Sequence, residues 1–348
     1  MEKYPPTMNL ISDVLSQHPE YKISVFTSIN SSPYKGLNYS KVKIFRFGSV
    51  SENSVIRYFY YIIFNLLGTL MLLLTRPDIV IVYESLSIFP AFIYAKFFPE
   101  KKIHIHYHEY VSLPEKEVAS RYMKFLFDCE EKLLRKCTIS QTNDDRKNLF
   151  LKDYSNLKSE NIYVYPNTPP NSWWRDYGQF KKPREDGKIK LVYVGVLDAE
   201  TMYLEEILRL VSEKPNDLEL TLFSQDISAS ANKLITRFQS ENIHLKTALD
   251  YYELPKELIK HDIGLVLYKG HIPNYVFIVP NKVFEYLSCG LQVVFDKAML
   301  TLLKSNLNGT YHIEFRKIED IKIIETFKNF ESVQFQGYLG QNQLINTL

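Results

Sequence analysis

The stretch from Val279 to Val294 reads Val-Pro-Asn-Lys-Val-Phe-Glu-Tyr-Leu-Ser-Cys-Gly-Leu-Gln-Val-Val. Pro280 suits the first turn of a helix, because its φ is fixed and no amide hydrogen is needed there. Apolar side chains then recur at helical spacing, and Gly290 is the residue type that ends a helix. The apolar run Leu291–Phe295 is typical of a buried strand. The stretch therefore predicts a helix that packs on a sheet and leads into one of its strands.

Two charged residues share a face of this predicted helix near its amino terminus. Lys282 and Glu285 lie three positions apart, so their side chains are neighbours on a helix. Free backbone amides, the helix dipole and a lysine together make an anion site suited to a diphosphate. A glutamate beside that site can accept two hydrogen bonds from a ribose diol. The alternative is an amphipathic helix whose lysine and glutamate simply face solvent, which is common.

Short apolar runs alternate with helical patterns along the chain, which is typical of parallel sheets covered by helices. We expect strands at Tyr21–Ser28, Val42–Gly48, Asp78–Glu84, Lys102–Glu109, Cys137–Asn143, Asn161–Asn167, Lys188–Gly195, Leu218–Ser224, Asn242–Leu249, Asp262–Tyr268 and Leu291–Asp296. The predicted fold class is α/β, with two doubly wound Rossmann-like domains. Such domains in series face a cleft, and ligands bind there, outside the carboxyl ends of the strands.

A breaker-rich stretch begins at Pro166 and marks the expected domain boundary. We expect an amino-terminal domain at residues 1–170, a linker at 171–187 and a carboxyl-terminal domain at 188–348. A doubly wound domain usually opens with a strand, whereas this chain opens with the helix-like Met8–Leu15. The first strand of the amino-terminal domain is therefore expected to be missing.

Composition excludes several function classes. The 348 residues carry 42 Lys and Arg against 40 Asp and Glu, a net charge of +2, so the basic surface of a nucleic-acid binder is not expected. Three scattered cysteines and no hydrophobic signal sequence at the amino terminus indicate the cytoplasm. Aromatic residues reach 14%, an excess that a large core or a hydrophobic surface could each explain.

One segment raises the question of a membrane. From Tyr58 to Thr75 no residue is charged, and the segment is about as long as the shortest bilayer-spanning helix, roughly 17 residues. Because the strand expected from Asp78 follows directly, a spanning helix would separate that strand from its sheet. A helix of the core or domain surface and a helix lying in the membrane interface, peripheral on the inner face, both remain open.

Generic cofactor motifs are absent from the sequence, which contains neither G-x-G-x-x-G nor G-x-x-x-x-G-K-[ST], and this disfavours dehydrogenases and P-loop enzymes. No G-x-S-x-G elbow occurs, so serine hydrolases are disfavoured too. His104, His106 and His108 alternate along an expected strand, too far apart for one metal ion, so no metal site is expected. His104 and His106 are interpreted as ordinary strand residues. His108 and Glu109 are candidate catalytic residues, because they lie where the strand ends.

The stretch at Pro280–Val294 resembles the donor-site motif of glycosyltransferases with the two-domain GT-B fold, in particular the family 4-like group. Weaker matches follow in order along most of the chain: Tyr4-Pro-Pro, Arg76-Pro-Asp-Ile-Val, Tyr165-Pro-Asn-Thr-Pro, Tyr193-Val-Gly-Val-Leu and Leu254-Pro. The resemblance implies transfer of a sugar from a UDP- or GDP-linked donor, without a cofactor or catalytic metal, usually with retention. It also implies a tail beyond Phe327 that crosses back to the first domain.

The resemblance also assigns residues. Glu285 would bind the donor ribose, Lys282 and the Gly290 region would hold the diphosphate, and His108 would contact the donor sugar. The remaining donor-site candidates are Gly195, Tyr268, Lys269, Pro280 and Asn281. The expected function is sugar transfer to a glycan or lipid-linked acceptor in cell-surface polysaccharide synthesis.

The chain departs from the family pattern in two places. Val196 and Leu197 follow Gly195, with Thr201 and Met202 where the family carries basic residues, and Phe277 replaces a frequent glutamate. Two alternatives therefore stay open. One is a catalytically degenerate protein that binds a partner, and the other is a nucleotide-sugar epimerase.

Overall fold

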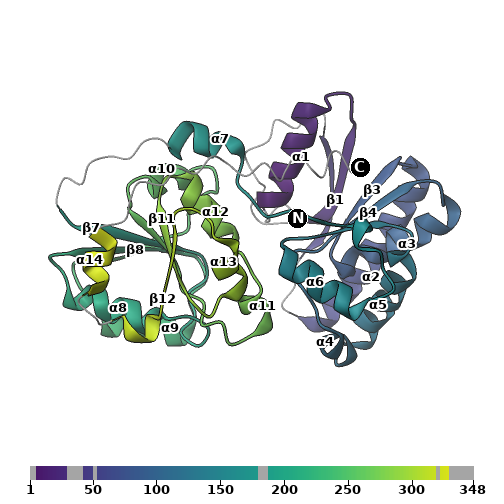
Figure 1. Ribbon diagram of the computed structural model, residues 1–348. Helices are drawn as coiled ribbons and strands as arrows, with labels where there is room; N and C mark the ends of the chain where they lie inside the picture. Colours follow the sequence, from purple (N-terminus) through teal and green to yellow (C-terminus); the bar gives the residue numbers. More distant parts are fainter. Residues whose placement is uncertain (1–4, 30–41, 50–52, 179–186, 319–321, 329–348) are drawn as a thin grey trace. The chain divides into compact units, whose positions relative to one another are not determined.

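The computed structural model describes residues 5–29, 42–49, 53–178, 187–318 and 322–328 (Figure 1). The described chain divides into two units, one up to Pro166 and one from Asn167 onward, called unit 1 and unit 2 below. Unit 2 has one parallel sheet and unit 1 has two, and helices pack against the sheets of both units. The α/β fold class is therefore confirmed.

Unit 2 is built on six parallel strands in the order β12-β11-β10-β7-β8-β9. The strands are β7 (Ile189–Val194), β8 (Leu218–Ser224), β9 (Ile243–Thr247), β10 (Ile263–Val266), β11 (Gln292–Asp296) and β12 (Thr310–Ile313). The helices are α7 (Asn171–Trp173), α8 (Leu204–Glu213), α9 (Ala229–Arg237), α10 (Leu254–Leu258), α11 (Pro273–Val276), α12 (Asn281–Ser288), α13 (Leu300–Ser305) and α14 (Lys322–Lys328). This is the strand order of a doubly wound nucleotide-binding domain.

The strand order of unit 2 reverses between β7 and β10, which lie side by side. The chain leaves β7 toward β8 on one side and leaves β10 toward β11 on the other. The loops after these two strands therefore diverge and open a crevice at the carboxyl edge of the sheet. Two buried clusters, one containing Leu208 and the other Leu287, form the unit's core.

Unit 1 contains two separate parallel sheets in its described part. One pairs β1 (Ile23–Ile29) with β2 (Val42–Ser49), and the other has the order β3-β4-β5-β6, formed by β3 (Ile79–Tyr83), β4 (Lys102–His106), β5 (Thr138–Gln141) and β6 (Ile162–Val164). The helices are α1 (Pro5–Gln17), α2 (Ser54–Thr75), α3 (Ile88–Phe97), α4 (Leu113–Glu117), α5 (Arg121–Leu134) and α6 (Asp144–Asp153). The described residues include no strand before α1 and none that joins the two sheets.

All eleven expected strands are present, and the sequence missed only β12 among the described strands. Several predicted ends are wrong by two or three residues. The strand expected at Lys102–Glu109 ends at His106, so His108 and Glu109 lie in the following loop. Residues 171–178, inside the predicted linker, form helical turns that bury Trp173 in the core of unit 2. The expected crossing of the tail lies outside the described residues.

Candidate donor site in unit 2

Helix α12 begins at the crevice between the loops that follow β7 and β10. Pro280 is its N-cap, one position before the predicted first turn, and Gly290 follows its end with φ +76°. Every residue from Lys282 to Ser288 is buried, including the apolar residues predicted to face the sheet. Lys282 and Glu285 are each only 9% exposed, so the alternative in which they simply face solvent is wrong.

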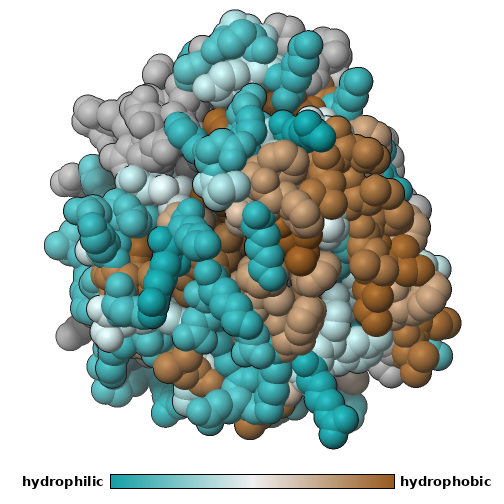
Figure 2. Space-filling view, turned by 90° about the vertical axis from the view of Figure 1, so that its right-hand side faces the viewer, coloured by the Kyte–Doolittle hydropathy of each residue, from teal (hydrophilic) through white to brown (hydrophobic). Residues whose placement is uncertain are grey.

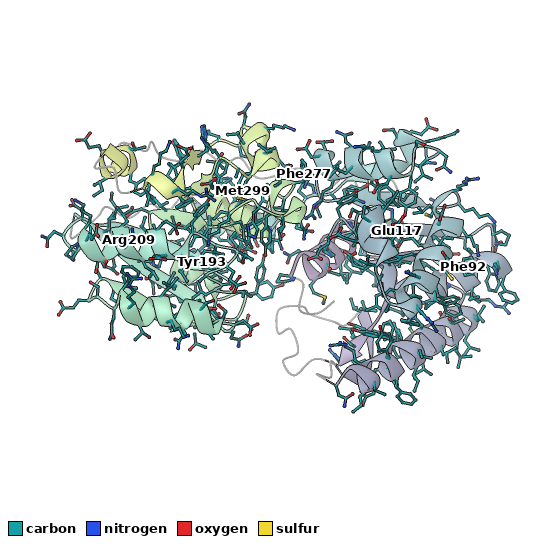
Figure 3. The ribbon with its side chains drawn as sticks, turned by 90° about the horizontal axis from the view of Figure 1, so that it is seen from below. Phe92, Glu117, Tyr193, Arg209, Phe277 and Met299 are labelled. Carbon is teal, nitrogen blue, oxygen red and sulfur yellow. The ribbon has the colours of Figure 1, made fainter. Side chains whose placement is uncertain are left out.

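The Lys282 ammonium is fixed between two tyrosines. Its Nζ donates a hydrogen bond to the Tyr193 hydroxyl at 3.0 Å and lies 4.0 Å from the centre of that ring and 5.0 Å from the Tyr268 ring. The Tyr193 hydroxyl in turn donates to the Val196 carbonyl at 2.9 Å. Tyr193 lies inside the body of unit 2, in contrast to Arg209 on its outer side (Figure 3). These contacts hold the cation at the end of β7.

Gly195 gives the Lys282 ammonium room to approach the backbone. Its φ is +137°, and a Cβ at this position would lie 3.2 Å from Lys282 Nζ. Any other residue would therefore be strained and would crowd the cation. A backbone stretch without side chain, next to a fixed positive charge, is an arrangement that suits close approach of a diphosphate.

Glu285 is a buried carboxyl group near the same cation. Burial raises its pKa to about 7, while the charge of Lys282 and a hydrogen bond from Tyr251 lower the pKa. Near neutral pH the group is therefore present in both protonation states. Its ionised form is a strong acceptor, as recognition of a ribose diol requires.

The remaining donor-site candidates have mixed surroundings. Tyr268 stacks on Tyr275 with ring centres 4.6 Å apart, and burial raises its pKa to about 12, so it stays a neutral phenol. Lys269 Nζ donates to the Ala199 carbonyl at 2.8 Å and so is tied to the loop after β7. Asn281 is the first residue of α12. A Cβ on Gly290 would meet the Gly178 carbonyl at 2.8 Å, so this glycine is needed for packing.

His108 and Glu109 belong to unit 1, and their surroundings are those of that unit. His108 stacks on Tyr83 at the carboxyl edge of the β3–β4 pair, with ring centres 5.6 Å apart. The Glu109 side chain is exposed. His104 is buried and contacts the hydroxyls of Thr138 and Ser140, which confirms its interpretation as a strand residue.

His106 is likewise buried, and its ring contacts the Ser140 hydroxyl at 2.7 Å. Within the part of the chain that the structure describes, no group of three or more His, Cys, Asp or Glu residues could hold a metal ion.

Sequence reasoning missed three residues around these sites. Tyr193 and Tyr251 contact the Lys282–Glu285 pair, and Glu84 contacts the backbone at His108. Tyr193 belongs to the motif that opens the second domain, but nothing in its spacing indicates a partner 89 positions away. Glu84 has no motif at all.

Comparisons with known proteins place this geometry in a wider group. No protein-family model matches the sequence, and no curated protein matches it. Among solved structures, the sucrose-phosphate synthase of Thermosynechococcus elongatus is similar over 98% of this chain and 88% of its own, with 12% identity and a TM-score of 0.66. Anabaena HepE in complex with UDP and glucose is similar over 93% and 86%, with 12% identity and a TM-score of 0.64.

A third similar structure belongs to another class of enzyme. It is a protein of Listeria monocytogenes provisionally assigned as a UDP-N-acetylglucosamine 2-epimerase, similar over 99% of this chain and 92% of its own, with 13% identity and a TM-score of 0.64. Identities this low establish the fold and not the reaction. Two parallel α/β units and matches over nearly the whole chain lead to one conclusion: this chain has the GT-B fold of nucleotide-sugar glycosyltransferases.

Proposed function

We propose that the protein is a glycosyltransferase that moves a sugar from a UDP- or GDP-linked donor to a glycan or lipid-linked acceptor. The observation that carries this proposal is the buried pair of Lys282 and Glu285 beside Gly195, at the reversal of the unit 2 strand order. Ligands bind at this place in open α/β sheets. The solved complex of the similar HepE with UDP and glucose supports a nucleotide donor.

The chemistry asked of these residues is the stabilisation of a leaving diphosphate. Lys282 supplies a fixed positive charge, and charge that is fixed before reaction stabilises a transition state without reorganisation. Glu285 would accept hydrogen bonds from the ribose hydroxyls, and His108 would contact the sugar. Retention of configuration, a reaction without a catalytic metal and a role in cell-surface polysaccharide synthesis are parts of the same proposal.

Binding of a nucleoside diphosphate tests the donor site. UDP or GDP should raise the melting temperature of the wild-type protein, because a ligand of the native state stabilises it. Glu285→Ala should abolish the rise, whereas Glu241→Ala, at an exposed position of unit 2, should keep it. No shift of the wild type with any nucleoside diphosphate would refute a working donor site and favour the degenerate alternative.

The epimerase alternative is favoured by the Listeria neighbour, because an epimerase also binds a nucleotide sugar. The two reactions differ in their products. A transferase releases free nucleoside diphosphate when an acceptor is added, whereas an epimerase changes the sugar and leaves it attached. Chromatography of the nucleotide after incubation with a panel of donors, with and without acceptor, distinguishes them.

We further propose that α2 lies in the interface of an anionic membrane, on the inner face. Val55–Thr75 is the single helix of the described residues that is long and apolar enough to cross a bilayer. One stripe of it is exposed, formed by Val55, Phe59, Ile62, Leu66, Leu70 and Leu74. Hydrophobic side chains gather in a continuous band on this side of unit 1 (Figure 2).

The opposite stripe of α2 argues against a spanning helix. The Asn65 amide is buried and donates to the Leu86 carbonyl at 3.2 Å and to the Tyr122 hydroxyl at 2.9 Å. Gly68 lies against Pro90, where a Cβ would be only 3.1 Å from that ring. A helix held in this way on one face, with an apolar opposite face, suits a position parallel to the membrane plane.

The charges around the apolar stripe fit anionic headgroups. Arg76 caps the end of α2, and Lys96 lies on the adjacent α3 with its ammonium 4.3 Å from the Phe92 ring centre. Asp78, an exposed acid three positions after the end of α2, is paired with Lys101 at 2.6 Å. Basic residues beside an apolar face add electrostatic attraction to apolar insertion.

Vesicle sedimentation tests this contact. The protein should sediment with phosphatidylglycerol-containing vesicles and less with pure phosphatidylcholine, and Leu66→Lys with Leu70→Lys should abolish binding. Leu300→Lys changes another exposed leucine, in unit 2, and should have no effect. If the wild-type protein sediments with neither kind of vesicle, the membrane contact is refuted. If the wild type is instead a dimer that the double variant disrupts, α2 is a protein–protein interface.

A further inference from the structure

Glu84, the residue after β3, has a backbone conformation that side chains rarely adopt. Its φ is 61° and its ψ is 159°, a region populated almost only by glycine. The other described non-glycine residues with positive φ, Arg76 and Asn306, lie in the ordinary left-handed region, with ψ of 56° and 37°. Strain of this kind persists only where surrounding contacts impose it.

The strained backbone directs the Glu84 carboxylate to the loop that carries His108. Its Oε1 accepts hydrogen bonds from the backbone amides of His108 at 2.5 Å and of Glu109 at 3.1 Å. The Glu84 amide itself donates to the His106 carbonyl at 3.1 Å, at the end of the β3–β4 pairing. The side chain therefore continues the ladder past the end of the strand and holds the next two residues.

Two further contacts complete a clamp around His108. The Arg146 guanidinium, 1% exposed on α6, donates to the His108 carbonyl and to the Thr142 hydroxyl. The imidazole contacts the rings of both Tyr83 and His106, with centres 5.6 Å and 4.7 Å away. Both sides of the His108 backbone and its ring are thus held by buried or partly buried groups.

We propose that Glu84 is a positioning residue that holds His108 in the geometry needed for sugar transfer. The role in sugar transfer rests on the proposed function. The contacts that hold His108 in place are observed within unit 1 alone. In this role Glu84 contacts no reacting atom and acts through the loop backbone. Strained backbone conformations cluster at active sites, and Glu84 lies beside a candidate catalytic residue.

The protonation state of Glu84 should govern the clamp. Burial raises its pKa to about 7, the two amide hydrogen bonds lower the pKa, and the charges of Glu109 and Glu130 raise it. Among the described residues, the other charged or titratable groups beside Glu84 and this loop include Arg146, His106, His108, Tyr83 and Tyr107. An ionised carboxylate binds two amides more strongly than its neutral form does, so the clamp should tighten as the pH rises through about 7.

Amide NMR of the full chain reads this clamp without any enzyme assay. Labelling with ¹⁵N-histidine gives eight backbone signals, and His108→Ala removes and thereby assigns one. The His108 amide proton should be shifted far downfield and should move with a midpoint near pH 7. In Glu84→Gln this movement should vanish. An amide that does not titrate in the wild type would overturn the clamp.

Turnover then tests positioning. Glu84→Gly removes the carboxylate and relieves the strain, so we expect turnover to fall roughly a hundredfold while the melting temperature stays equal or rises. Glu84→Gln keeps an acceptor oxygen and should lose less, and the KM for donor should stay unchanged in both. Turnover that falls only in parallel with stability would overturn the proposal. If the wild type transfers no sugar while the His108 amide titrates, the proposed function fails and the clamp is purely structural.

Discussion

Replacing Glu285 by glutamine should weaken nucleotide binding and stabilise the fold at the same time. Burial raises the Glu285 pKa from 4.5 to about 7, so an ionised carboxylate at this position destabilises the folded protein. A neutral amide of nearly the same shape avoids that cost. In the proposed donor site it would also lose charge-assisted hydrogen bonds to the ribose, each of which stabilises by about 1.5 to 3 kcal/mol.

The size of the stability change follows from the pKa of Glu285 in the unfolded and in the folded protein. At about 1.4 kcal/mol per pH unit, the difference corresponds to about 3 kcal/mol of unfolding free energy. Because the folded-state pKa is the higher one, the stabilising contribution is fully present below about pH 4.5 and is lost as the pH rises to about 7. Between pH 5 and pH 8, the unfolding free energy of the wild type should therefore fall by about 2 kcal/mol or more relative to that of Glu285→Gln.

Chemical denaturation at pH 5 and pH 8 measures the stability difference, and calorimetry with UDP or GDP measures affinity. Glu241→Gln, an exposed glutamate of the same unit, is the matched control and should change neither quantity. Wild-type affinity should fall roughly tenfold per pH unit below about 7 if the ionised form binds. A stability difference that is equal at both pH values would refute the reasoning, even if affinity falls.

Three other substitutions test the packing of the two units and the proposed donor site. Gly264→Ala would place a Cβ 2.1 Å from the Tyr286 ring, so chemical denaturation should show a loss of about 3 kcal/mol. Gly195→Ala should weaken UDP binding in calorimetry more than it lowers stability, because the strained Cβ displaces the Lys282 ammonium. Asn65→Leu should cost about 1 to 3 kcal/mol by removing the buried amide that ties α2 to Leu86, again measured by denaturation.

The fold could be predicted largely because buried parallel strands are short apolar runs bounded by breakers. β12 escaped detection because Thr310–Ile313 mixes Thr, Tyr and His with one aliphatic residue at the edge of the sheet. The predicted strand ends were too long for a related reason. Residues such as His108 and Glu109 continue the alternating pattern past the last ladder hydrogen bond, so the pattern does not mark where pairing stops.

The part of the candidate site that lies within one helix could be predicted from the sequence, and the contacts from distant parts of the chain could not. Lys282 and Glu285 are neighbours on one helix, so their spacing alone brings them together. Tyr193 and Tyr251 reach them from other elements, and only the folded sheet order makes these contacts. Glu84 could not be found from sequence, because nothing in its residue type indicates a positive φ.

The contacts of Lys282 explain how a diphosphate site could work without the basic residues that the resembled motif carries after Gly195. Val196 and Leu197 bring no charge there, but the Val196 carbonyl accepts a hydrogen bond from the Tyr193 hydroxyl and so turns the lone pairs of that hydroxyl toward Lys282. The cation is thus fixed in a buried place by two rings and one hydroxyl, none of which carries a charge that would neutralise it. Its Coulomb partner is Glu285, whose raised pKa leaves the pair partly uncompensated near neutral pH. One ordered, poorly compensated cation can attract a diphosphate more effectively than a flexible exposed one, because its orientation entropy is already lost in the folded state.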